Sequence, residues 1–217
     1  MSDEWHRASG SGGPPPAPSA SVVLVRDSEV LLLRRNATLA FHGGAWVFPG
    51  GRCDGPETPV QAAVRETFEE AGLQVQAERL VRFARWTTPE GRPRRFVADF
   101  FLADAPEGEV VVDGGEIVEA RWWRPSEALK ARDAGALVLP PPTFVTLWRL
   151  AHGQLARDGV EVDEILPVSV PVSGGTCALY PGDAGYATAS VDARGRRHRA
   201  WLLDAGWRYE RDVGSKT

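Results

Sequence analysis

Short apolar runs separated by turn-forming residues open the patterned part of the chain. Val22 to Val25 and Val30 to Leu33 flank a polar turn at Arg26 to Glu29, which predicts a β-hairpin. A further extended run, Ala45 to Phe48, ends at Pro49-Gly50-Gly51, where the glycines permit a sharp turn. The chain therefore begins its fold with strands and passes into a loop after Phe48.

A short amphipathic helix is predicted after this loop. Thr58 offers a side-chain hydroxyl for the N-cap, Pro59 suits the first helical position, and Gln61 completes a capping box. Gly72 is well placed as the C-terminal stop. The residues expected on the core-facing side of this helix are Val60, Val64, Thr67, Phe68 and Ala71.

The pattern downstream alternates between strands and helices. Helices are expected over Ser126 to Ala134 and from an N-cap at Thr143 to about His152. This interleaving predicts an α/β layered domain over about residues 18 to 154. The strands expected within it are Leu80 to Trp86, Phe96 to Ala103, Glu109 to Val112 and Ile117 to Trp123.

The two ends of the chain differ from this domain. Residues 1 to 17 are rich in glycine, proline and serine, and a disordered tail is predicted there. Residues 155 to 217 are predicted to form a small β-rich extension, with strands at Ile165 to Val172, Ala187 to Val191 and His198 to Leu203. The basic segment Arg194 to Arg199 is interpreted as a solvent-facing hairpin turn, and His198 as structural or exposed.

Composition narrows the function classes. A net charge of -4 and a pI near 5.6 argue against a dedicated nucleic-acid binder. The apolar runs are much shorter than the roughly 20 residues of a membrane helix, so no membrane span is expected. Two cysteines, Cys53 and Cys177, do not make a disulfide framework and suit a reducing cytoplasm. The sequence leaves open whether the protein is a monomer or a homodimer.

Three acids of the predicted helix carry the candidate chemistry. At about 100° per residue, Glu66, Glu69 and Glu70 share one stripe opposite the apolar stripe, facing solvent. Like charges at this spacing weaken a helix by roughly a few tenths of a kcal/mol per pair. A hard divalent cation removes the conflict, so Mg²⁺ is the expected cofactor, with Mn²⁺ as the alternative. The competing interpretation is a solvated, glutamate-rich helix face.

The spacing around these acids is specific. Gly51 is followed by Glu57, Arg65-Glu66, Glu69-Glu70 and Gly72 at intervals that resemble the Nudix box. The resemblance implies an α/β/α sandwich with a mixed sheet that binds metal through Glu66, Glu69 and Glu70. Catalytic roles are implied for Glu66 and Glu69, with Arg65 orienting carboxylates by pairing with Glu57 or Glu69. The implied reaction is hydrolysis of a pyrophosphate bond in a nucleoside diphosphate derivative.

Two details of the resemblance lie outside the acid stripe. The box usually has an aliphatic residue where this chain has Thr67, whose hydroxyl fits the core if it bonds back to a carbonyl one turn earlier. In several branches of the family the general base is a glutamate from a downstream loop. Asp113 and Glu116 lie where such a loop is expected, although both also fit as ordinary acids beside a glycine turn.

Further segments resemble the acyl-coenzyme A diphosphatase branch. The resemblance implies that the substrate is a small nucleotide-type molecule, coenzyme A or one of its thioesters, cut to 3',5'-ADP and a 4'-phosphopantetheine product. The stricter signature of that branch has an arginine where this chain has Ala40. ADP-ribose, dinucleotides, nucleoside triphosphates and a non-catalytic nucleotide-sensing module remain alternatives. The segments that carry the resemblance are Leu32 to Arg35, Trp46 to Gly51, Arg65 to Gly72, Arg95-Phe96, Phe100 to Ala103 and Trp122 to Pro125.

Substrate contacts are expected from a few residues in and near these segments. Arg94 and Arg95 offer positive charge for a phosphate, and Trp46 offers a ring to stack on a base. Surface arginines and a buried tryptophan are the simpler interpretations of the same residues. Gly50 and Gly51 of the turn complete the set of candidate substrate-binding residues.

Overall fold

The computed structural model describes residues 15–155 and 162–212. The chain divides into two compact units. The main unit comprises Ala17–Arg85 and Val97–Asp163, and the described parts of the C-terminal unit are residues 15–16, 86–96 and 164–212. Nearly all of the predicted N-terminal tail lies outside the described residues.

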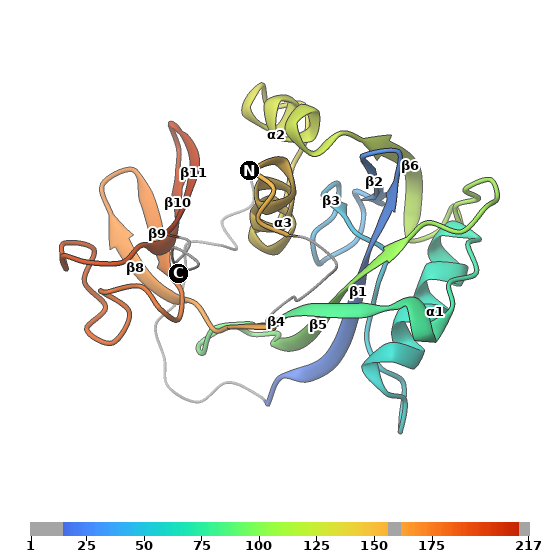
Figure 1. Cartoon of the computed structure of the whole chain (residues 1–217), viewed down its shortest axis with the longest axis horizontal. Helices are drawn as coiled ribbons and strands as arrows, with labels where there is room; N and C mark the ends of the chain where they lie inside the picture. Colours follow the sequence, from blue (N-terminus) through green and yellow to red (C-terminus); the bar gives the residue numbers. More distant parts are fainter. Residues whose placement is uncertain (1–14, 156–161, 213–217) are drawn as a thin grey trace. The chain divides into compact units, whose positions relative to one another are not determined.

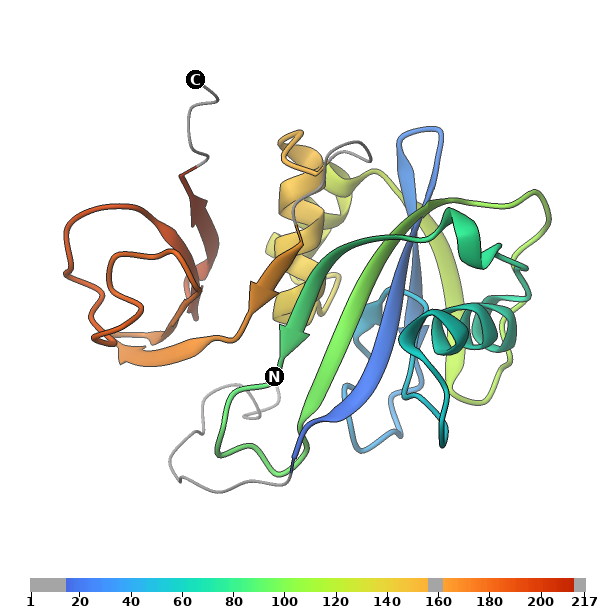
Figure 2. The ribbon, with the colours of Figure 1, turned by 60° about the horizontal axis from the view of Figure 1, so that its bottom comes forward.

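A mixed sheet forms the centre of the main unit, with α1 on one side and α2 and α3 on the other (Figures 1 and 2). This arrangement confirms the α/β/α sandwich. The strands run in the order β3-β2-β1-β5-β4-β7, and β6 also pairs with β2. Their bounds are Ala17–Arg26 for β1, Glu29–Arg35 for β2, Trp46–Val47 for β3, Val81–Thr87 for β4, Phe96–Asp104 for β5, Ile117–Trp123 for β6 and Asp163–Ile165 for β7.

The first hairpin forms because its apolar runs are buried on both faces of the sheet. Val25 pairs with Val30 across an antiparallel β1–β2 ladder. The turn between them places Asp27 and Ser28 at positive φ, as a two-residue hairpin turn requires. β1 begins at Ala17, five residues earlier than the apolar run, so the last residue of the predicted tail lies in a strand.

Helix α1, Pro59–Ala71, confirms the predicted caps. The Thr58 hydroxyl accepts from the Gln61 amide and the Gln61 side chain accepts from the Thr58 amide, which completes the capping box. Gly72 ends the helix at φ 69°, a left-handed conformation that glycine adopts without steric cost. The Thr67 hydroxyl donates to the Ala63 carbonyl at 2.7 Å, as predicted for this departure from the box.

The predicted faces of α1 are wrong at two positions. Phe68 was expected in the core, but 53% of its surface is exposed. Glu70 was expected to face solvent, but it is buried. The buried face of the helix is shifted from the predicted one toward Ala62 and Ala63, small residues that bring this side close to the sheet. As a result, the edge of the acid stripe is covered.

The remaining helices, α2 (Pro125–Asp133) and α3 (Pro141–Ala151), lie close to the predicted ranges. Thr143 was predicted as the N-cap of the second, but α3 begins at Pro141 and Thr143 is buried within its first turn. Proline tolerates the first helical position because the amide it lacks has no intrahelical partner there. The strand predicted over Glu109 to Val112 is absent; this segment is an irregular loop.

The C-terminal unit contains a four-stranded antiparallel sheet in the order β11-β10-β9-β8. Its strands are β8 (Val168–Val172), β9 (Gly175–Leu179), β10 (His198–Leu203) and β11 (Gly206–Arg211). The strand predicted over Ala187 to Val191 is wrong, since this segment forms turns. Strands β9 and β11 were not predicted from the sequence pattern.

The basic segment Arg194 to Arg199, whose last two residues belong to β10, is also not the hairpin turn that was predicted. Arg194 and Arg196 are exposed, but His198 and Arg199 are buried within the unit. Asp183 accepts two hydrogen bonds from the Arg199 guanidinium, at 2.7 and 2.6 Å. Arg199 is therefore part of the interior of this unit.

Among the described residues, no helix is both long enough and apolar enough to cross a membrane.

Candidate active site

Arg65 is the centre of a carboxylate cluster on α1. Its guanidinium forms a bidentate pair with Glu57, with Nε to Oε1 at 3.0 Å and Nη2 to Oε2 at 2.9 Å. The Nη1 atom lies 2.9 Å from Glu66 Oε1 and 2.9 Å from Glu69 Oε2. The predicted pairing of Arg65 with Glu57 or Glu69 is thus present to both partners at once.

The local fold explains how one arginine reaches three acids. Glu69 lies one helical turn after Arg65, so the two side chains share a face of α1. Glu57 precedes the helix in the loop, where it also accepts from the Asp54 amide at 2.9 Å. The hydrogen bonds from Arg65 hold the pKa of Glu57 below its ordinary value, and those from Glu57 raise the pKa of Arg65. Arg65 is therefore a permanent cation in this cluster.

Glu70 is turned inward toward the glycine turn. The Gly50 amide donates to Glu70 Oε2 at 2.9 Å, and only 6% of the residue is exposed. Burial raises the pKa of Glu70 to about 8, because a single amide hydrogen bond offsets only part of the lost hydration. Burial also raises the pKa of Glu66, against the hydrogen bond from Arg65. Burial thus disfavours the charged form of both carboxylates, and it outweighs the cations beside them.

The two glycines of the turn make room for this arrangement. A Cβ atom on Gly51 would lie 2.2 Å from Glu66 Oε1, which is far inside van der Waals contact. A Cβ atom on Gly50 would lie 2.2 Å from the Ala20 carbonyl oxygen, and Gly50 has φ 149°. The turn therefore positions two acids, a role distinct from the substrate contacts predicted for these glycines.

The downstream loop distinguishes the two candidate bases. Asp113 accepts backbone hydrogen bonds from Gly115, Glu116 and Ile117, at 2.8 to 3.1 Å. Although partial burial opposes them, these bonds hold the pKa of Asp113 below its ordinary value. Its carboxylate is committed to the turn. Glu116 is 64% exposed at its side chain and lies near enough to add to the negative charge felt by Glu66 and Glu70.

The donor set fits a hard divalent cation. Glu66, Glu69 and Glu70 offer only carboxylate oxygens, and the space left by the missing Gly51 side chain holds the Glu66 carboxylate against the turn. In the arrangement described for residues 15–155 and 162–212, no three potential ligands converge on one point. Arg65 pairs with Glu66 and Glu69, while the Gly50 amide donates to Glu70. The three carboxylates thus come from one helix but have different partners.

The predicted substrate contacts are placed in different parts of the molecule. Trp46 is buried in the main unit and packs edge-on against Trp123, with ring centroids 6.3 Å apart, which fits the packing interpretation. Arg94 and Arg95 follow β4 on a loop that belongs to the C-terminal unit, where Arg95 Nε donates to the Thr88 carbonyl at 3.2 Å. Their role toward a substrate stays a prediction.

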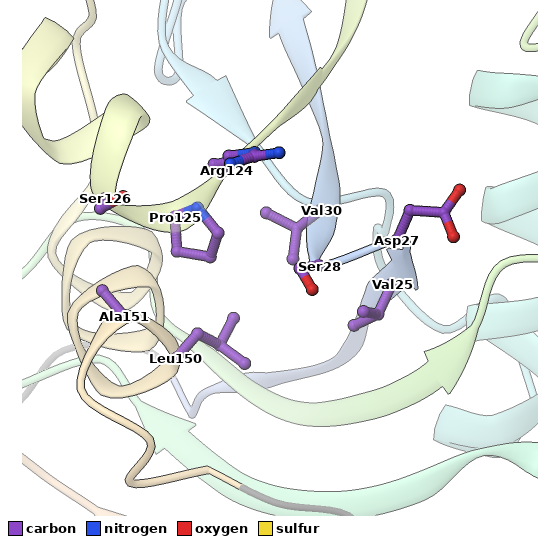
Figure 3. Close-up of a pocket in the computed structure, with 9 residues that line it drawn as sticks. All are labelled: Val25, Asp27, Ser28, Val30, Arg124, Pro125, Ser126, Leu150 and Ala151. Carbon is purple, nitrogen blue, oxygen red and sulfur yellow. The ribbon is translucent and has the colours of Figure 1, made fainter.

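A separate cavity of about 390 Å³ lies in the main unit. Figure 3 shows it between the tip of the β1–β2 hairpin, the start of α2 and the end of α3. None of the box residues lines it. Its lining residues are Val25, Asp27, Ser28, Val30, Arg124, Pro125, Ser126, Leu150 and Ala151.

The sequence pattern missed one charged residue of the site. Arg35, at the end of β2, lies 4.0 Å from Glu70 Oε1 through Nη1 and 3.4 Å from Glu116 Oε2 through Nη2. The signal available in the sequence was a basic residue that ends an otherwise apolar strand. That signal does not say which acids such a residue meets.

The family assignment follows from comparison with known proteins. The sequence description of the NUDIX domain matches residues 15–140, more than half of the chain. The chain therefore belongs to the Nudix hydrolase family.

Curated relatives carry several different activities in their names. A putative 8-oxo-dGTP diphosphatase 3 of Mycobacterium tuberculosis is 34% identical over 173 residues, 76% of this chain and 75% of the relative. The NAD-capped RNA hydrolase NudC of Salmonella heidelberg is 30% identical over 147 residues, 68% of this chain and 51% of the relative. Putative nudix hydrolase 7 of Caenorhabditis elegans is 28% identical over 62% of this chain and 60% of the relative. The chain thus spans about half to three quarters of the length of these proteins.

Solved structures support the fold. A Nudix hydrolase from Alicyclobacillus acidocaldarius aligns with 64% of this chain and 92% of its own, with a TM-score of 0.57 and 24% identity. A MutT Nudix hydrolase from Burkholderia pseudomallei aligns with 62% of this chain and 98% of its own, with a TM-score of 0.54 and 25% identity.

Proposed function

We propose that this protein hydrolyses the pyrophosphate bond of a nucleoside diphosphate derivative with a divalent cation, Mg²⁺ or alternatively Mn²⁺. The observation that carries the proposal is the surplus of negative charge around Arg65 and the glycine turn in a member of the Nudix family. Glu66, Glu69 and Glu70 are the residues that would hold the cation. When bound, the cation would neutralise phosphate charge and make a bound water more acidic.

The protein's own residues supply orientation and proton transfer. Arg65 holds Glu66 and Glu69 on one face of α1, and its bidentate pair with Glu57 fixes the guanidinium plane. Glu116 is the proposed general base, because it is exposed beside the acid site while Asp113 is engaged by three amides. Its carboxylate would take the proton of the attacking water.

For the substrate we favour coenzyme A or an acyl-coenzyme A, cut to 3',5'-ADP and (acyl-)4'-phosphopantetheine. The support is the set of segments that resembles the acyl-coenzyme A diphosphatases, which extends beyond the box into β2 and β6. A second candidate is a nucleoside triphosphate, cut to the monophosphate and pyrophosphate. Its support is the 34% identity to the mycobacterial relative named as an 8-oxo-dGTP diphosphatase.

A product assay separates these candidates. The protein is incubated with Mg²⁺ and, in turn, coenzyme A, acyl-coenzyme A, ADP-ribose, NADH and nucleoside triphosphates, and the products are resolved chromatographically. Release of 3',5'-ADP supports the coenzyme A assignment, and monophosphate with pyrophosphate supports the second candidate. Turnover of another substrate would support the same reaction with a different substrate. No turnover of any of these compounds would favour a nucleotide-sensing module.

Matched variants test the site itself. Glu69→Gln and Glu70→Gln are expected to lose on the order of 10²-fold or more in kcat, since each removes a charged metal ligand. Glu78→Gln is the control, because Glu78 is an exposed acid outside the cluster. Equal activity of all three variants and the parent would contradict the assignment of the box acids.

A further inference from the structure

Arg35 occupies a position between the glycine turn and the downstream loop. It is the last residue of β2, and only 18% of its side chain is exposed. One amino group of the guanidinium faces Glu70 at 4.0 Å, and the other donates to Glu116 at 3.4 Å. Within the described part of the chain, its Nε atom has no hydrogen-bond partner. Of the two acids that face this largely buried guanidinium, Glu116 is therefore the one that accepts a hydrogen bond from it.

The loop that carries Glu116 is fixed to the same end of β2. The Asn36 amide donates to the Glu116 carbonyl at 2.7 Å, and the Asn36 side chain donates to the Gly115 carbonyl at 3.0 Å. Asp113 caps the turn from the other side through three backbone amides. The backbone of Glu116 is thus held by neutral hydrogen bonds and the Asp113 carboxylate, which are independent of Arg35.

The side chain of Glu116 is in a different situation from its backbone. It is mostly exposed and lies beside an acid cluster that repels it. The Arg35 guanidinium provides the attraction that draws its carboxylate toward the cluster. A rigid guanidinium fork suits this task, because its two amino groups point in fixed directions toward two separate acids.

We propose that Arg35 is a positioning residue that holds the Glu116 carboxylate beside the box acids, where Glu116 acts as general base. This inference rests on the proposed function, and in particular on hydrolysis that uses Glu116. Arg35 acts through Glu116 and not on the substrate. Its loss should therefore slow the chemical step while substrate binding changes little.

Kinetics of single variants give the first test. With the substrate identified by the product assay, Arg35→Gln is expected to lower kcat by about tenfold to hundredfold with KM changed by less than about threefold. Arg35→Lys keeps the charge but loses the fork, so it should recover part of kcat. Arg34→Gln is the matched control: Arg34 precedes Arg35 on β2 and pairs with the exposed Glu119 at 3.1 Å.

A double-mutant cycle distinguishes positioning from general structural support. Glu116→Gln should lower kcat more than Arg35→Gln does, and adding Arg35→Gln to Glu116→Gln should cost less than about threefold more. A residue that only supports the fold would lower kcat by the same factor in both backgrounds. Thermal unfolding of each variant identifies any that fail to fold. If Arg35→Gln fails to fold, Arg35→Lys takes its place in the same cycle.

The outcomes separate the two levels of the proposal. A parent protein that is inactive on the whole panel would contradict the proposed function. If the parent is active but the losses in kcat from Arg35→Gln and Glu116→Gln multiply in the double variant, the proposed role of Arg35 is overturned and the proposed function stands. A large rise in KM with unchanged kcat would also overturn it, because Arg35 would then bind substrate directly.

Discussion

Two arginine–carboxylate groups in this molecule use the same kinds of side chain but differ in burial and in charge balance. In the C-terminal unit, Arg199 is 1% exposed at its side chain and forms a one-to-one bidentate pair with Asp183. In the main unit, Arg65 is partly exposed and shares its guanidinium among Glu57, Glu66 and Glu69. The first group is electrically balanced, whereas the second has more negative than positive charge.

The remaining contacts of the two groups reinforce the contrast. The third side of the Arg199 guanidinium donates to the Val191 carbonyl, and Asp183 accepts from the amides of Gly185 and His198. This network satisfies itself and orders the turns before β10. Around Arg65, three acids share one guanidinium, so one cation faces three carboxylates. Balance and burial indicate a structural role, while surplus charge at a partly open surface indicates a ligand site.

Asp183→Asn should have the largest effect on stability. The substitution leaves the Arg199 cation buried without its counter-ion, which is expected to cost about 3–5 kcal/mol. Urea unfolding measures the loss, and hydrogen exchange should locate it in β9 and β10. Asp192→Asn, at an exposed turn position, is the control. A cost below about 1 kcal/mol for Asp183→Asn would show that the balanced pair is not what holds this unit.

Acid should affect the main unit before the C-terminal unit. Burial and then the nearby Arg35 lower the pKa of His42 from 6.5 to about 4, so the folded protein resists protonation there. The stability this provides is complete above pH 6.5 and is lost as the pH falls toward 4, by up to about 3 kcal/mol. Burial alone would raise the pKa of Asp183, but the hydrogen bonds from Arg199 and from two backbone amides outweigh it and lower this pKa below its ordinary value, so that contribution is lost only in stronger acid.

His42→Asn tests this order. Asparagine tolerates the positive φ of 54° at this position and does not titrate. The unfolding free energies of parent and variant are measured from pH 7.5 to 4. Below pH 6.5 the parent should lose stability relative to the variant, because only the parent has His42 to protonate in the unfolded state. Parallel curves over this range would contradict a neutral, partly buried His42.

Gly51→Ala should damage the acid site more than the fold. The added methyl group would overlap the Glu66 carboxylate and force that side chain away from the turn. A loss of about tenfold to hundredfold in kcat is expected from such a displacement. Gly55→Asn is the control, since its Cβ would meet nothing within 4 Å and asparagine accepts its φ of 52°. Full activity of Gly51→Ala would show that Glu66 has another acceptable position.

Glu57→Gln should have the smallest effect on stability. Its partner Arg65 retains Glu66 and Glu69, and the pair is partly exposed and screened by water, so a much smaller loss than that of Asp183→Asn is expected. Urea unfolding beside Asp183→Asn makes the comparison direct. Similar losses in both variants would remove the distinction between the balanced and the surplus-charge groups.

Local features of the main unit were predictable because neighbours in sequence decide them. Thr58, Gln61 and Gly72 cap α1 through contacts within a few residues, and Thr67 bonds to the carbonyl four residues before it. Thr143 misled the prediction of α3 because a proline at the first position of a helix serves as well as a capping hydroxyl. The segment Ala187 to Val191 was predicted as a strand because small and polar residues alternate there, but so short an alternation is weak evidence. Its conformation depends instead on the buried Arg199–Asp183 pair, since Arg199 also donates to the Val191 carbonyl.

The sequence by itself determined the α/β class, the box, the ends of α1 and the presence of Glu66, Glu69 and Glu70 on one helix. These depend on periodicity and on spacings within one helix and its flanking loops. Only the tertiary structure decided that Glu70 turns inward to the Gly50 amide, 20 residues away, and that Arg35 meets Glu116, 81 residues away. Such contacts depend on which strands become neighbours, and no local spacing specifies them.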